Sequence, residues 1–180
     1  MNDRPINDRI VFEDVSKFYG EILGVNRINL SIPPGITSLV GPNGSGKTTL
    51  MNCITGVVRP NAGRIVFAGT EISNVSTHGR AQMGIARTFQ IPRPFTGLSV
   101  AENVRVPLDY THHAKAPSER IAELIALVGL EARANDPAET LSQLELRKLE
   151  LGRALALDPK LLIVDEVMAG LTESDRKSVV

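Results

Sequence analysis

Short runs of apolar residues, some of them alternating with polar ones, punctuate the first ninety positions of the chain. Runs of this length, rich in β-branched and aromatic residues and bounded by glycine, proline or asparagine, are typical of β-strands. A run that is apolar throughout is typical of a strand buried on both faces. The segments that we predict as strands are residues 9–15, 28–32, 36–40, 64–68 and 85–90.

The middle of the chain changes to a helical pattern. Residues 91–97 contain two prolines and a glycine, which interrupt regular structure. Residues 100–106 predict a short helix, and Ser118 predicts the N-cap of a longer helix that Gly129 ends. Apolar side chains recur in that longer helix at the spacing of one helical face, namely Ile121, Leu124, Ile125 and Val128.

The last third returns to an α/β pattern. Ser142 and Glu145 have the spacing of a capping box and predict the start of a helix that runs to about Asp158. Residues 161–166 (LLIVDE) follow, with four apolar residues running into two acids. This pattern is typical of a buried parallel strand whose carboxyl end opens into a site.

Composition limits the classes of function. At 180 residues the chain can form one domain with a sizeable core. Its 20 Lys and Arg balance 20 Asp and Glu, and it has no Trp, so neither the charge nor the stacking platform of a nucleic-acid binder is present. The single cysteine, Cys53, excludes an internal disulfide and fits a cytosolic setting. No apolar run approaches the ~18 residues of a membrane span, so we expect a soluble chain.

Residues 41–49 (GPNGSGKTT) match the phosphate-loop pattern G-x-x-x-x-G-K-[ST]. Glycines let such a loop turn its backbone N–H groups toward a polyphosphate, and the helix predicted over residues 47–55 would aim its N-terminus there. The Lys47 ammonium would contact the β/γ-phosphates, and the Thr48 hydroxyl is a suitable Mg²⁺ ligand. We expect the phosphates to lie against Gly41, Pro42, Asn43, Gly44, Ser45, Gly46, Lys47, Thr48 and Thr49.

Acidic and amide side chains at strand ends supply the rest of a phosphoryl-transfer site. Asp165 stands at the tip of a predicted buried strand, where an acid that holds Mg²⁺ belongs. Glu166 follows it and can accept a proton from the attacking water, and Gln90 can reach the metal or the water from its own strand. The expected catalytic residues are Glu166, Gln90 and Lys47, and the expected metal ligands are Thr48, Gln90 and Asp165. The plainer alternative is that the two acids are solvated side chains at a strand end.

These motifs resemble, over nearly the whole chain and in the same order, those of the nucleotide-binding subunits of ABC transporters. Residues 41–49 look like the Walker A motif, RTFQ places Gln90 at the Q-loop, and residues 161–166 look like Walker B with its catalytic glutamate. Residues 141–145 (LSQLE) stand where the family has its LSGGQ signature. Tyr19, in KFYG, stands where the family stacks an aromatic ring on adenine.

The resemblance implies a fold and a domain organisation. The fold is α/β, a P-loop NTPase core of the ABC ATPase type with an N-terminal antiparallel β portion and a helical lobe. Residues 1–180 would form a single nucleotide-binding domain. Its expected parts are residues 1–90 for the β and P-loop core, 91–145 for the helical lobe and 146–180 for the return to the core with Walker B.

The resemblance also implies a function. The expected cofactors are ATP and Mg²⁺, and the expected partners are a transmembrane permease subunit and a second ABC ATPase subunit, identical or different, in a head-to-tail dimer. Ser142 would contact the ATP held by the other subunit. The chain would be cytoplasmic and peripheral on the inner face of the membrane. FQIPRPFTGLSVAENV and DEVMAGL look most like the ATPase subunits of branched-chain amino acid importers.

Two departures from the family pattern favour a second hypothesis. The signature lacks both glycines, with Gln143 and Leu144 in their places. The chain ends at Val180, and all its histidines precede Asp165, so none matches the family's switch histidine. We therefore expect a fold incomplete at the C-terminus, and the alternative function is a truncated module that binds ATP without efficient hydrolysis. A soluble ABC protein acting on ribosomes or DNA would need paired cassettes or a coiled coil, whereas the sequence shows one cassette and no sustained heptads.

Overall fold

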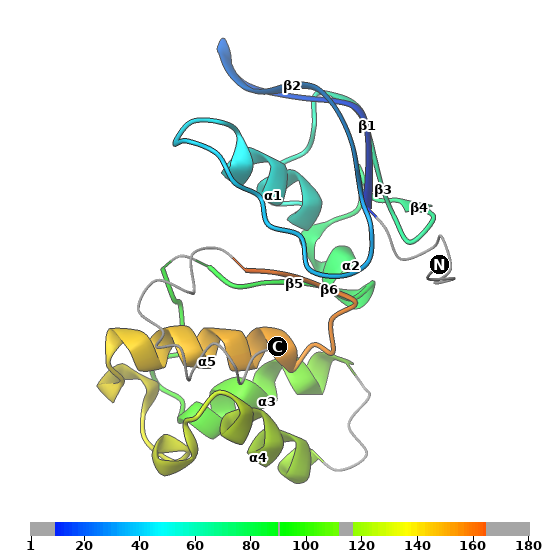
Figure 1. Ribbon diagram of the computed structural model, residues 1–180. Helices are drawn as coiled ribbons and strands as arrows, with labels where there is room; N and C mark the ends of the chain where they lie inside the picture. The colour runs from blue at the N-terminus through cyan, green and yellow to red at the C-terminus, as the bar shows by residue number, and fades with distance from the viewer. Residues whose placement is uncertain (1–9, 90, 112–116, 165–180) are drawn as a thin grey trace. The chain divides into compact units, whose positions relative to one another are not determined.

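The computed structural model describes residues 10–89, 91–111 and 117–164, and within it the chain forms two compact units, Met1–Arg80 and Ala81–Val180 (Figure 1). The first unit contains the strands β1 to β4, the helix α1 and most of α2. The second contains β5 and β6, the helices α3 to α5 and two short 3₁₀ turns. The C-terminal residues 165–180, with Asp165 and Glu166, lie outside the described residues, as does Gln90.

A four-stranded antiparallel sheet forms the first unit, in the order β2-β1-β3-β4. β1 and β2 make a long hairpin in which Tyr19 pairs with Ile22 across the turn at Gly20. Alternate side chains of β1 and β3 are buried and give the unit its core. The strands are β1 (Ile10–Tyr19), β2 (Ile22–Ile32), β3 (Ala62–Phe67) and β4 (Thr70–Glu71).

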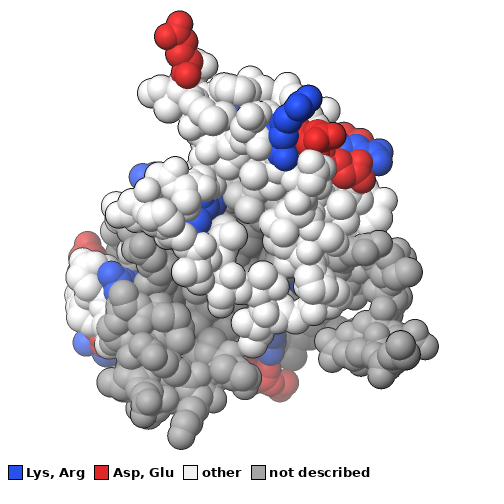
Figure 2. Space-filling model, turned by 45° about the horizontal axis from the view of Figure 1, so that its top comes forward, with Lys and Arg blue, Asp and Glu red and all other residues white. Residues whose placement is uncertain are grey.

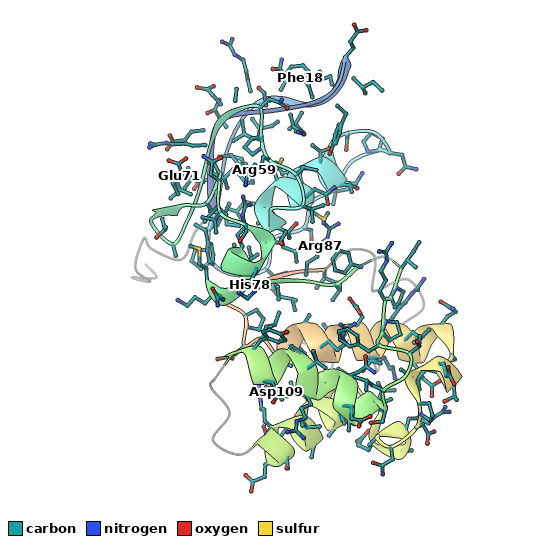
Figure 3. The ribbon with its side chains drawn as sticks, turned by 180° about the vertical axis from the view of Figure 1, so that it is seen from behind. Phe18, Arg59, Glu71, His78, Arg87 and Asp109 are labelled. Atoms are coloured by element: carbon teal, nitrogen blue, oxygen red, sulfur yellow. The ribbon has the colours of Figure 1, made fainter. Side chains whose placement is uncertain are left out.

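Two helices complete the first unit. α1 (Lys47–Thr55) occupies the range predicted from the phosphate-loop motif, and Gly56 ends it with a left-handed φ of 78°. α1 packs beside the sheet and buries Leu50, Cys53 and Ile54 (Figure 1). The short α2 (Thr77–Gln82) follows β4, and His78, labelled in Figure 3, is exposed.

The second unit places three helices together with a two-stranded parallel sheet (Figure 1). Its core joins apolar side chains of α3, α4 and α5, among them Val104, Leu124 and Leu149. The elements are β5 (Ile85–Arg87), α3 (Val100–Thr111), α4 (Pro117–Leu127), η2 (Glu131–Arg133), η3 (Ala138–Thr140), α5 (Gln143–Leu155) and β6 (Leu161–Ile163).

The prediction of a strand over residues 36–40 is wrong. This segment joins neither described sheet, and Ile36 and Val40 are 88% and 90% exposed. Apolar composition signals the preference for a strand, but a strand forms only where a neighbouring strand receives its backbone hydrogen bonds. Neither sheet that the structure describes offers these residues such a neighbour.

Several element boundaries also differ from the predictions. α4 begins at Pro117, so Ser118 is a helical residue and not the N-cap; a proline at the first helical position is favourable because its φ is already helical. α3 continues through Pro107 to Thr111, and Leu108 on this extension is buried. α5 ends at Leu155, three residues before the predicted end near Asp158. None of the helices in the described parts of the chain is long and apolar enough to span a bilayer.

Candidate functional site

A tight loop at residues 41–46 leads into α1. Ser45 N–H donates to the carbonyl oxygen of Pro42 at 3.2 Å, which closes a turn within the loop. Gly44 and Gly46 both have left-handed backbones, with φ of 81° and 89°. Non-glycine residues rarely adopt this conformation, so the loop depends on glycine at these two positions.

One of the outer glycines of the motif is required for space as well. A β-carbon at Gly46 would lie 2.6 Å from Val25 Cγ1 and 2.9 Å from the carbonyl oxygen of Gly24. A β-carbon at Gly41 would lie 2.8 Å from Ser45 Oγ, the end of a side chain that can rotate away. β2 therefore packs directly against Gly46, and only a residue without a side chain fits there.

The N-terminus of α1 is suited to an anion. Its N-cap is Gly46, which has no side chain to accept from the first N–H groups, and the first turn contains no acid. These N–H groups and the helix dipole together favour a negative charge at this end. The exposed Thr48 and the half-buried Thr49 lie in the same first turn. The residues present therefore fit the phosphates of a nucleotide.

Lys47 lies inside the loop. Its Nζ donates to the carbonyl oxygens of Gly41 at 2.6 Å and of Pro42 at 2.8 Å. Ser45 Oγ lies 3.5 Å from the same nitrogen. The ammonium is thus held by neutral oxygens and has no carboxylate partner in these contacts, which leaves its charge available to a phosphate.

Tyr19 lies next to the loop through Gly24 of β2. A β-carbon at Gly24 would lie 3.0 Å from Tyr19 Cε2 and 3.0 Å from Thr49 Cγ2, so the tyrosine ring and α1 flank the same glycine. The ring is 42% exposed, and Lys17 Nζ lies 5.5 Å from its centroid. Phe18, labelled in Figure 3, is also partly exposed on the same hairpin. An exposed aromatic ring therefore stands beside the phosphate loop.

The far end of α1 is held by a buried arginine that the sequence analysis did not identify. Arg80 is fully buried, and its guanidinium donates to the carbonyl oxygens of Cys53 and, at 2.8 Å, of Ile54. It also donates to Val75 at 2.9 Å and to Ser73 at 3.2 Å. Burial lowers the pKa of Arg80, but an arginine stays protonated. Its positive charge therefore lies at the negative end of the α1 dipole.

Ser142 caps α5 as the sequence predicts. Ser142 Oγ accepts from Glu145 N–H at 3.3 Å, and Glu145 Oε2 accepts from Ser142 N–H at 2.8 Å, which is the full capping box. Hydrogen bonds from the backbone and side chain of Ser142 to the carboxylate lower the pKa of Glu145, and Arg133 contributes from 3.6 Å. Ser142 belongs to the second unit, whereas the phosphate loop belongs to the first.

The two strands of the parallel sheet end side by side. Arg87 of β5 pairs with Ile163 of β6, and Thr88 N–H donates to the carbonyl oxygen of Ile163 at 3.0 Å. Figure 3 labels Arg87 at the end of β5. Gln90 and Asp165 follow these strand ends in sequence within three residues. The carboxyl edge of one sheet thus leads to both predicted segments.

Two residues around the site, Gly24 and Arg80, were not predicted from the sequence. A glycine inside a strand, such as Gly24, often marks close approach of another backbone. Arg80 has no comparable signal, because its role depends on carbonyl groups 26 and 27 residues away.

On the face in Figure 2, the described Lys, Arg, Asp and Glu side chains are dispersed, with both signs present.

Comparison with known proteins places this geometry in a family. The ABC transporter family pattern matches residues 25–169. A probable branched-chain amino acid transport ATP-binding protein LivG of Archaeoglobus fulgidus is 36% identical over 173 residues, covering 88% of this chain and 67% of that protein. The high-affinity branched-chain amino acid transport ATP-binding protein LivG of Escherichia coli K12 is 35% identical over 178 residues, covering 89% and 70%. The sulfate/thiosulfate import ATP-binding protein CysA of Synechocystis is 34% identical over 172 residues, covering 94% and 48%.

Solved structures agree. MJ1267, an ATP-binding cassette of an ABC transporter, superposes with a TM-score of 0.81 at 28% identity, covering 96% of this chain and 74% of that one. MJ0796, a dimeric cassette in a post-hydrolysis state bound to ADP and Pi, gives a TM-score of 0.85 at 25% identity, covering 94% and 79%.

The fold and the phosphate loop therefore define a P-loop ATPase cassette, and the chain belongs to the ABC transporter family. The resemblance drawn from the sequence motifs is confirmed, as is the α/β fold of the ABC ATPase type. The family is one of ATP-binding enzymes that hydrolyse ATP, and dimeric cassettes occur among its solved structures.

Proposed function

We propose that the chain is the ATP-binding subunit of an ABC importer, and that ATP binding and hydrolysis by this subunit power transport. The observation that carries the proposal is the loop at residues 41–46. There the Lys47 ammonium lies against the carbonyl oxygens of Gly41 and Pro42, and Gly46, which has no room for a side chain, begins α1 without a side-chain cap. A loop of this construction fits the β- and γ-phosphates of a nucleotide.

Adenine and the metal are assigned from the same region. Tyr19 would stack on the adenine ring, since it lies exposed beside the loop. Thr48 and Asp165 would hold Mg²⁺, with Gln90 as a further ligand. When bound, Mg²⁺ would neutralise charge on the phosphate oxygens. In this assignment Lys47 orients and neutralises the β/γ-phosphates.

Hydrolysis is assigned to the end of β6. Glu166 would accept a proton from the water that attacks the γ-phosphorus, and Gln90 would orient that water. Phosphoryl transfer needs little more than such positioning and charge neutralisation. In the proposed organisation, residues 1–90 form the β and P-loop core, residues 91–145 the helical lobe and residues 146–180 the return to the core.

A second ATPase subunit would complete each site. In a head-to-tail dimer, identical or mixed, Ser142 and the N-terminus of α5 would meet the γ-phosphate of the ATP on the other subunit. The leucine and glutamine in place of the signature glycines predict a weaker contact than in subunits that keep them. The dimeric state of the MJ0796 cassettes supports this arrangement.

The solute and the location are assigned from relatives. The LivG names favour branched-chain amino acids as the transported solute, while CysA shows that a relative of similar identity carries a name for a different solute. The partner would be a transmembrane permease subunit, with the ATPase on the inner face of the membrane. The phosphate site itself does not read the solute.

The test compares ATP binding with ATP hydrolysis. In the full-length protein, Glu166→Gln should bind ATP as the wild type does and lose turnover, whereas Lys47→Ala should lose binding. Equilibrium nucleotide titration and steady-state phosphate release measure the two. Wild-type binding without turnover would support the alternative of a non-hydrolysing module, and undiminished hydrolysis by Glu166→Gln would remove Glu166 from the role of base.

A further inference from the structure

An ion pair on α5, formed by Glu150 and Arg153, binds the backbone of Arg93, three residues after Gln90. Arg153 NH1 donates to the carbonyl oxygen of Arg93 at 2.9 Å, and the Arg93 backbone hydrogen-bonds to the Glu150 carboxylate. Arg153 NH1 also donates to Glu150 Oε2 at 3.0 Å. Both backbone groups of one residue are therefore held by two side chains that also hold each other.

Glu150 is buried, and Arg153 is partly buried, with its side chain 20% exposed. Glu150 is only 7% exposed, and burial raises the pKa of Glu150, while Arg153 and the Arg93 backbone act against that rise. The Arg153 guanidinium lies 4.8 Å from the centroid of the Phe95 ring, within the range of a cation–π contact. Arg153 thus contacts the same segment at two points, through the Arg93 carbonyl and through the Phe95 ring.

A second helix holds the same segment. Asn103 of α3 is fully buried, and its amide pairs with the Phe95 backbone in both directions, accepting from Phe95 N–H at 2.9 Å and donating to its carbonyl oxygen at 3.0 Å. Asn103 also donates to Ser99 O at 3.0 Å and to Leu98 O at 3.3 Å. Residues 93–95 are therefore fixed to α3 and α5 by hydrogen bonds from side chains to the backbone.

We propose that Glu150 and Arg153 are positioning residues, which anchor residues 93–95 to α5 and so fix the end of the chain that leads back to Gln90. The inference rests on the proposed function, because it matters only if Gln90 acts in ATP hydrolysis. Three residues of extended chain span only about 10 Å, so an anchor at Arg93 restricts the positions that Gln90 can reach. α5 begins at Gln143, directly after its N-cap Ser142, and the ~16 Å from this cap to Arg153 links the signature to the anchor.

The chemistry of the contact points to positioning more than to stability. A buried ion pair is often no more stabilising than apolar residues of the same volume, because both charges lose their hydration. This pair contacts Arg93 only through the backbone. It therefore fixes the position of the chain at residue 93 and does not depend on the side chain there. Such contacts hold a loop in one geometry, because few other conformations satisfy the same hydrogen bonds.

The experiment measures kcat and the Kd for ATP separately in the full-length protein. Glu150→Gln keeps the shape but removes the charge, and we expect kcat to fall by about 10-fold or more while the Kd for ATP changes by less than about 2-fold. The exchange of the Arg93 amide with deuterium should become faster. A protein in which Glu150→Gln keeps kcat within about 2-fold of the wild type would overturn the proposal.

The chain contains a matched control. Arg120 and Glu123 on α4 form a pair with the same three-residue spacing and the same 3.0 Å separation, but both side chains are largely exposed. Glu123→Gln should change neither kcat nor the Kd. An equal loss of kcat in Glu123→Gln would overturn the proposal, because it would show a general effect of lost surface charge.

A second variant covers the case in which Glu150→Gln does not fold. Arg153→Lys keeps the charge, but a single ammonium cannot reproduce the fork that reaches Glu150 and the Arg93 carbonyl together. It should lower kcat in the same way, and unchanged kcat in folded Arg153→Lys protein would overturn the proposal. If the wild type itself releases no phosphate, the proposed function fails, whereas failure of the variants alone contradicts only the positioning role.

Discussion

The Lys47 ammonium lies 2.6 Å from the carbonyl oxygen of Gly41, six residues before it in the chain. This contact closes the loop with a flexible side chain whose charge no carboxylate neutralises in these contacts. An exposed hydrogen bond of this kind contributes little to folding, while in the proposed function the charge is central to phosphate binding.

Lys47→Ala should therefore separate binding from stability. We expect an unchanged melting temperature without nucleotide, because the lost contacts are exposed. The wild type should gain about 2.7 kcal/mol at an ATP concentration 100 times its Kd, and the variant should gain nothing. Thermal unfolding with and without ATP measures both. A variant that melts well below the wild type without ATP would contradict this division of roles.

Gly46→Ala should disturb the loop from inside. The new β-carbon would lie 2.6 Å from Val25 and would occupy a left-handed backbone with φ of 89°. We expect a loss of roughly 1–3 kcal/mol in the free energy of unfolding together with lost ATP binding. Gly97→Ala is the control, since a β-carbon there meets nothing within 4 Å. Denaturant titration compares the two, and equal effects would refute the steric argument.

Arg80→Met should be the most destabilising of these changes. It leaves the carbonyl oxygens of Cys53 and Ile54 without the buried donor and removes a positive charge from the end of α1. We expect a loss of roughly 3 kcal/mol or more in unfolding free energy. Arg64→Met removes an exposed arginine that pairs with Glu13 and should lower the melting temperature far less. Similar melting temperatures for the two variants would be evidence against the role of Arg80.

The charge of Glu145 should make stability depend on pH. Ser142 lowers the pKa of Glu145, so the folded state binds this proton more weakly than the unfolded state. The stabilisation is complete above an unfolded pKa of about 4.3 and is lost as the pH falls through the lower folded pKa. Glu145→Gln keeps the capping box without the charge. The wild type should melt higher at pH 7, and the gap should close in acid; a constant gap would contradict the assignment.

Arg93→Ala should have almost no effect. The anchor reaches Arg93 through its backbone, and its side chain is exposed. We expect the free energy of unfolding to change by less than about 0.5 kcal/mol and kcat to stay near the wild-type value. Phosphate release and thermal unfolding test this in parallel with Glu150→Gln. A large loss in Arg93→Ala would mean that the arginine side chain itself has a role.

The parts of the fold that local chemistry specifies were predictable from the sequence. The phosphate-loop pattern gave the range of α1, including its end at Gly56, and the capping box at Ser142 gave the start of α5. In each case residues within four positions of one another determine the structure. Ligand contacts of Tyr19, Gln90, Asp165 and Glu166 remain predictions, and the last three residues lie outside the described part of the chain.

The parts that depend on distant partners were not predictable. The apolar segment at residues 36–40 has a strand-like sequence, yet it has no strand beside it in the described structure. Arg80 and Glu150 have no signal in the sequence that predicts their burial. Each binds backbone groups that are far from it in the sequence and near it only in the folded chain.

Cys53, the single sulfhydryl of the chain, is completely covered in the middle of α1, and burial raises its pKa. Both effects protect it from electrophilic reagents, because attack requires an accessible thiolate. The rate at which a reagent alkylates the Cys53 sulfur therefore measures how often α1 opens transiently.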